Sequence, residues 1–154
     1  MSLVAILRVI AFYILAVLVA TLLGGLIQAQ INLADLAEAP ASLAERLAAT
    51  WAILPDVLPT FAAMVAAALV ITLPIAEVLS RIFRPWRWLL FALAGAGGIW
   101  AAYKVQETVL AMPNITAPGA GWQWLAVCVA VAIGSCLFGY LTRPKAKRGL
   151  RVLG

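Results

Sequence analysis

Glu77 is the acidic side chain that the sequence places nearest to membrane depth, late in a long apolar stretch. Thr72 and Pro74 precede it by five and three residues. Because a proline removes a backbone hydrogen bond from a helix, a kink, a hydroxyl and a carboxylate come together here. An ionisable group inside a membrane is costly and often belongs to a proton or cation pathway. This group of residues is therefore a candidate ion or proton site.

Arg81 offers a simpler role for the same carboxylate. It follows Glu77 by four residues, which places both side chains on one face of a helix. At the edge of the membrane the two would form an interfacial ion pair, and this is the role that we expect. Lys104 and Glu107, three residues apart, predict a second pair of this kind at the other edge.

Residues that usually carry catalysis or bind metals are scarce. The chain has no histidine, which removes histidine-based acid–base catalysis, bis-histidine haem ligation and the usual zinc sites. Cys128 and Cys136 lie eight residues apart in one predicted helix, a rise of about 12 Å that exceeds the reach of a disulfide. Gly95, Gly97 and Gly98 fall inside an apolar stretch and not in a phosphate-binding loop. We expect no catalytic residue, no metal site, no cofactor and no enzymatic activity.

The composition places these side chains on helices that cross a membrane. Of the 154 residues, 66% are hydrophobic and only 11% are charged, and the mean hydropathy is +1.06. A water-soluble domain needs about a quarter of its residues charged. Apolar runs of about 20 residues, enough for a helix to cross ~30 Å of hydrocarbon, recur four times. We predict an all-α integral membrane protein, a four-helix transmembrane bundle forming one membrane domain over residues 1–154, with spans at about 3–29, 57–79, 88–110 and 122–141.

Basic residues are distributed unevenly between the two sides of these spans. Nine lie on one side, and two, Arg46 and Lys104, lie on the other. Since positively charged loops stay in the cytoplasm, both termini are expected there. The membrane is expected to be a bacterial inner membrane. Trp86 and Trp88 mark the same boundary, because indole rings prefer the headgroup layer. The nine basic residues are Arg8, Arg81, Arg84, Arg87, Arg143, Lys145, Lys147, Arg148 and Arg151.

The segment 30–56, between the first two spans, has a pattern of its own. Ser42 and Glu45 have the spacing of a capping box, in which each side chain accepts a hydrogen bond from the other residue's backbone. Asn32 is predicted to cap a shorter turn before it. The apolar stripe that follows predicts a short amphipathic helix on the outer membrane surface, which would either cover the bundle or dock a partner. The stripe consists of Leu43, Leu47, Trp51 and Leu54.

Small residues recur every fourth position in three of the predicted spans. Small side chains let helix backbones approach closely, which is a main source of helix association in lipid. They indicate either packing of spans two, three and four against one another or a face left for another subunit. Alanine is so frequent that the pattern does not choose between the two. The positions are Ala62 and Ala66 in span two, Ala94, Gly98 and Ala102 in span three, and Ala126, Ala130 and Gly134 in span four.

Two functional hypotheses follow from these patterns. The first is a non-catalytic inner-membrane accessory, assembly or scaffold protein that acts through helix–helix contacts with other membrane proteins or with itself. The alternative is a small oligomeric transporter or channel component that uses Glu77 on a kinked second span. Membrane lipids are expected partners as well, because the basic cytoplasmic tail at 143–154 suits anionic headgroups. Nucleic acid is not an expected partner, since the basic residues are not accompanied by the aromatic residues of a nucleic-acid-binding motif.

Overall fold

The computed structural model describes residues 2–36, 38, 40–110 and 115–144, and these residues form helices and no strand. Each of the four long helices is apolar enough to cross a membrane, which confirms the predicted helical class and indicates a multi-pass membrane protein. Most of the basic tail lies outside the described residues, so its contact with lipid stays a prediction. The elements are α1 (Leu3–Ala34), α2 (Leu43–Ile82), the 3-10 turn η1 (Arg84–Trp86), α3 (Arg87–Thr108) and α4 (Gly121–Leu141).

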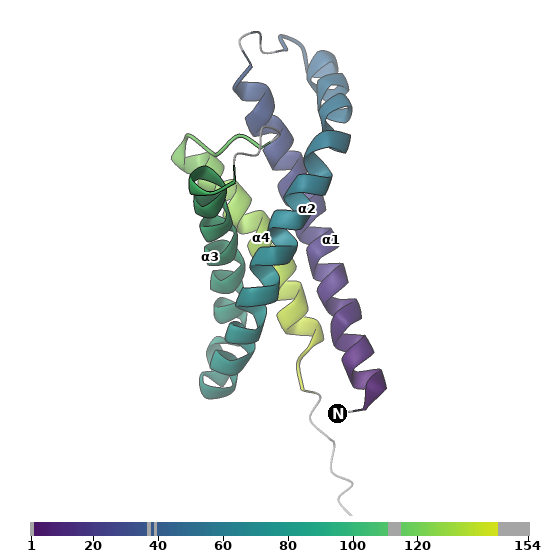
Figure 1. The fold of residues 1–154 in the computed structure, drawn as a ribbon, viewed down its shortest axis with the longest axis vertical. Coiled ribbons are helices and arrows are strands. Elements are labelled where there is room, and N and C mark those ends of the chain that lie inside the picture. Colours follow the sequence, from purple (N-terminus) through teal and green to yellow (C-terminus); the bar gives the residue numbers. More distant parts are fainter. Residues whose placement is uncertain (1, 37, 39, 111–114, 145–154) are drawn as a thin grey trace, which may run out of the picture.

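The helices run alternately up and down, so the start of α1, the turn η1 and the end of α4 share one end of the bundle (Figure 1). Around the bundle each helix packs against the next, and α4 closes the ring against α1. We call the end that holds η1 the basic end, because five arginines belong to it. The end of α1, the start of α2, the end of α3 and the start of α4 lie at the opposite end, which we call the far end. The arginines are Arg8, Arg81, Arg84, Arg87 and Arg143.

Small residues bring the backbones into contact at the helix seams. A Cβ placed on Gly134 of α4 would lie 2.7 Å from the carbonyl oxygen of Ala16 in α1 and 2.7 Å from the Cβ of Ala20. On the α3–α4 seam, a Cβ on Gly95 would lie 2.9 Å from the carbonyl oxygen of Val131. The sequence predicted packing among spans two, three and four and did not include α1. In the structure, Ala16 and Ala20 of α1 pack against Gly134 of α4.

The second helix is longer than the sequence predicted. Residues 43–56, expected as a separate helix on the membrane surface, are instead the first turns of the continuous 40-residue α2. Pro55 and Pro59 lie inside this helix. The first turns of α2 are linked to α1, where Gln30 Nε2 donates a 2.8 Å hydrogen bond to the hydroxyl of Thr50. At 1.5 Å per residue α2 is about 60 Å long and α3 about 33 Å, and Figure 1 shows α1 and α2 reaching beyond the other two helices.

The start of α2 has the predicted cap. Ser42 Oγ accepts a hydrogen bond from the backbone of Glu45 at 3.2 Å, and the carboxylate of Glu45 accepts one from the backbone of Ser42 at 3.4 Å. The predicted role of Asn32 as a helix cap is wrong. Asn32 lies inside α1, and its side-chain oxygen accepts hydrogen bonds from Gln28 Nε2 and from the backbone N–H of Thr116.

Candidate functional site

Arg87, the first residue of α3, holds three helices together at the basic end. Its Nη2 donates to Glu77 Oε2 of α2 at 2.8 Å, and its Nη1 donates to the hydroxyl of Ser80 at 2.7 Å. Its Nε donates to the carbonyl oxygen of Gly139 in α4 at 3.1 Å, and Nη2 also reaches the hydroxyl of Thr142 at 3.1 Å. The Arg87 side chain is only 11% exposed. With this set of partners its guanidinium is fixed in one position.

Arg81, the partner expected for Glu77, makes a weaker contact. Its Nε lies 3.7 Å from Glu77 Oε1, and its side chain is 74% exposed. Glu77 therefore has two arginine neighbours, of which Arg87 is the closer and the more buried. The sequence indicates Arg87 only as one of the basic residues that set the orientation, because its ten-residue separation from Glu77 does not place the two on one helix face.

Thr72 and Pro74 do not join this cluster. The hydroxyl of Thr72 donates to the carbonyl oxygen of Ala68 at 3.0 Å within its own helix, and Thr72 lies against Gly98 of α3. Pro74 is exposed on α2, which continues through it. Neither Thr72 nor Pro74 lines the hollow that Glu77 borders.

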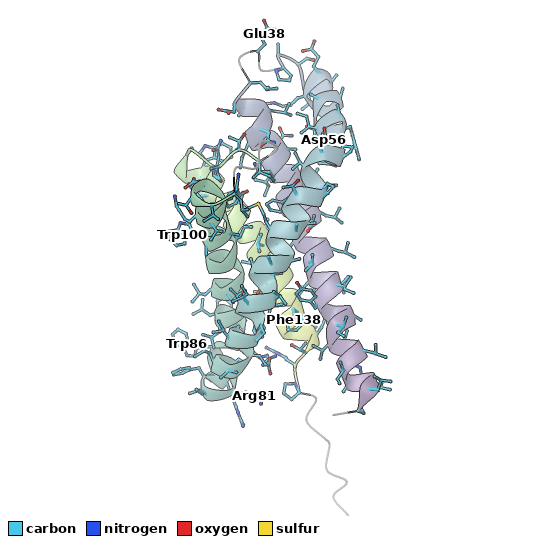
Figure 2. The ribbon with its side chains drawn as sticks, in the orientation of Figure 1. Glu38, Asp56, Arg81, Trp86, Trp100 and Phe138 are labelled. Carbon is cyan, nitrogen blue, oxygen red and sulfur yellow. The ribbon has the colours of Figure 1, made fainter. Side chains whose placement is uncertain are left out.

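The cluster around Arg87 borders a hollow at the basic end, which we call the arginine pocket. Its volume is about 620 Å³. Figure 2 shows Arg81 and Trp86 at this end of the molecule, with Glu38 and Asp56 at the far end. Four guanidinium groups and one carboxylate make the lining strongly positive. The pocket is lined by Glu77, Ser80, Arg81, Arg84, Arg87, Arg143 and Pro144.

A second hollow, the α2–α3 groove, lies between the middle of α2 and the second half of α3. Its volume is about 340 Å³, and its surface is almost entirely apolar. Two of the predicted small residues, Gly98 and Ala102, are in it. The described residues that line it are Ala63, Met64, Ala67, Ala68, Ile71, Thr72, Gly98, Ala101, Ala102, Val105, Gln106 and Leu110.

A buried polar cluster toward the far end went unnoticed in the sequence. The amide of Gln28, which is fully buried in α1, accepts a hydrogen bond from the hydroxyl of Tyr103 in α3. Its Nε2 donates to Asn32 Oδ1 and to the carbonyl oxygen of Thr116, both at 2.8 Å. The ring of Trp124 packs edge-on against Tyr103 at 5.3 Å between centroids. The cluster joins α1, α3, α4 and the connection before α4.

The remaining predicted positions are spread over the bundle. Ala130 and Gly134 are buried, and Ala62, Ala66, Ala94 and Ala126 are partly exposed. The stripe at the start of α2 is open, with Leu43 77%, Leu47 55% and Trp51 71% exposed, and Leu54 is partly buried. Lys104 Nζ lies 2.9 Å from Glu107 Oε2, at the surface.

Among the residues that the structure describes, no group of three or more His, Cys, Asp or Glu side chains could hold a metal ion. Cys128 and Cys136 are both free thiols. Their Sγ atoms lie 3.7 Å and 3.5 Å from the carbonyl oxygens of Ala96 and Trp88 on α3. The chain matches no protein-family model, and no curated protein or solved structure is significantly similar to it.

Proposed function

We propose that this chain is a non-catalytic accessory, assembly or scaffold protein of a bacterial inner membrane. It acts through helix–helix contacts with other membrane proteins or with further copies of itself. Its termini face the cytoplasm, since basic residues gather at the end of the bundle that holds them. The observation that carries the proposal is the α2–α3 groove.

Small side chains make this groove suitable for a foreign helix. Ala63, Ala67 and Ala101 are exposed along it, and Gly98 forms part of its floor. A partner helix can bring its backbone close to such a surface and gain van der Waals contact that larger lipid-facing side chains would prevent. The outer surface of α1 contrasts with it, because Leu15, Leu18, Leu22 and Leu26 project there with 42–57% exposure.

Transport through Glu77 has less support and remains the alternative. Its carboxylate contacts Arg87 and Arg81, while Thr72 lines the α2–α3 groove instead of the arginine pocket. Glu77 thus belongs to an ion-pair network that links α2 to the start of α3. Loss of a measured flux on Glu77→Gln, with the fold retained, would move transport to first place.

Site-specific photocrosslinking in intact cells tests the groove. A photoreactive residue at Ala101 should give one discrete adduct with a membrane protein, whereas the same residue at Ala11, exposed on α1, should not. Filling the groove with Ala67→Leu and Ala101→Leu should abolish the adduct formed from a probe at Ala63, and Ala11→Leu should leave it intact. Equal labelling from Ala101 and Ala11 would refute the groove as the contact surface.

A further inference from the structure

The arginine pocket contains more positive charge than the protein neutralises. Among the described residues, its lining holds four arginines and a single carboxylate, that of Glu77. The other five acidic residues lie elsewhere in the sequence, at 35–56 and at 107. Arg87 takes up the charge of Glu77 through the 2.8 Å contact, so Arg81, Arg84 and Arg143 remain as a group of net charge about +3.

One arginine of the pocket is held in place by hydrogen bonds, and the other three are exposed. Arg87 is held by the side chains of Glu77, Ser80 and Thr142, which gives the inner wall a defined shape. Arg81, Arg84 and Arg143 are exposed, and their guanidinium groups are suited to bidentate hydrogen bonds with phosphate oxygens. Because the N–H donors of a guanidinium group lie in one plane, a positively charged surface of arginines is suited to oxyanions such as phosphate.

The surroundings of the pocket favour a lipid phosphate over a dissolved one. Next to Arg81 and Arg84 in the chain, Ile82 and Phe83 are 68% and 54% exposed, and Trp86 of η1 is 59% exposed. Such a surface suits acyl chains on one side and headgroups on the other, and indole rings prefer this depth of a bilayer. Basic pockets between membrane helices on the cytoplasmic side are known binding sites for anionic headgroups.

We propose that the arginine pocket binds the phosphate group of an anionic phospholipid. The phosphate oxygens accept hydrogen bonds from Arg84 and Arg143, and the acyl chains lie along Ile82 and Phe83. The bound lipid then bridges the α2–η1 turn and the end of α4. This site is separate from the α2–α3 groove, and its test does not depend on a protein partner.

Lipid binding to the full chain, measured by native mass spectrometry from mild detergent, tests the proposal. Phosphatidylglycerol should bind more tightly than phosphatidylcholine. The double variant Arg84→Gln/Arg143→Gln should bind phosphatidylglycerol about thirtyfold more weakly, because each basic residue near an anionic surface contributes a factor of about five. The matched control Arg8→Gln/Arg46→Gln removes the same charge outside the pocket and should bind as the unmodified protein does.

Thermal stability in detergent provides the second measurement. Phosphatidylglycerol should raise the unfolding temperature of the protein and of the control, while millimolar inorganic phosphate should not. Should the double variant fail to fold by circular dichroism, each single variant should show about a fivefold loss of affinity. Equal binding of the two lipids, or an equal loss in pocket and control variants, would overturn the proposal. Stabilisation by inorganic phosphate alone would show a free-anion site and overturn the assignment to lipid.

Discussion

Arg87 donates to Glu77 across the turn between α2 and α3 at 2.8 Å, and the same guanidinium reaches the backbone of Gly139 in α4. A single side chain at the start of a helix thus fixes the relative positions of three helices. Arg81, Arg84 and Arg143 carry the same charge at the same end without this set of partners.

The Arg87–Glu77 contact predicts that removing either member destabilises the bundle. Arg87→Gln leaves Glu77 with the more distant Arg81, and we expect a loss of roughly 2 kcal/mol, as for other hydrogen bonds between charged groups. Glu77→Gln should resemble it. Arg81→Gln should change stability by less than about 0.5 kcal/mol, because its side chain is 74% exposed. Thermal unfolding of the three variants in detergent measures this order. Equal effects of Arg81→Gln and Arg87→Gln would contradict it.

The glycines of the helix seams predict a graded series of alanine variants. Gly134→Ala forces its Cβ to 2.7 Å from the Ala16 carbonyl oxygen, so we expect a loss of about 1–3 kcal/mol. Gly98→Ala meets Thr72 Cγ2 at 3.0 Å, where a side chain can yield, and should be milder.

Gly97→Ala is the control for this series, since a Cβ there has no neighbour within 4 Å. It should be neutral or slightly stabilising, because alanine is the better helix former. The bulkier Gly98→Leu should disrupt assembly while membrane insertion persists. An unchanged melting temperature for Gly134→Ala would show that α1 and α4 do not pack through this face.

The Gln28–Tyr103 hydrogen bond predicts a coupled pair of variants. Tyr103→Phe removes the donor and leaves a buried amide oxygen short of a partner, a loss of about 0.5–1.5 kcal/mol. Tyr140→Phe, at a residue 67% exposed, should be neutral. A double-mutant cycle of Gln28→Leu and Tyr103→Phe should show a coupling energy of similar size. Strict additivity would mean that the bond adds nothing to stability.

The proposed orientation predicts the behaviour of fusion proteins. A reporter active only in the cytoplasm should give signal when fused after Arg151, because nine of the eleven basic residues lie on that side. The same reporter at Ala41, in the far-end connection, should be silent. The reversed result would refute the orientation.

Composition alone was enough to predict the helical class, because apolar runs of this length have few other stable forms. The boundary between the surface segment and span two was predicted wrongly. Pro55 and Asp56 interrupt the apolar pattern, yet the helix continues, and Thr50 before them accepts a hydrogen bond from Gln30 of α1. Such lateral support comes from a neighbouring helix and leaves no mark in the local pattern.

The residues around Glu77 show a similar limit. Its spacing to Arg81 identifies one neighbour, since residues four apart share a helix face. Arg84 and Arg87 are three residues apart at the same turn, yet it is Arg87 that donates to Glu77, Ser80 and the end of α4, because η1 changes the direction of the chain between them. The seam between α1 and α4 was missed because the two helices are at opposite ends of the sequence.

The Gln28–Tyr103 bond also has a consequence for the order of events during synthesis. The two residues are 75 positions apart, so Gln28 leaves the ribosome well before its partner exists. At about 5–20 residues per second the gap is roughly 4–15 s. During that time the side-chain oxygen of Gln28 lacks its Tyr103 donor, and nearby water or the insertion machinery must take that place until α3 arrives.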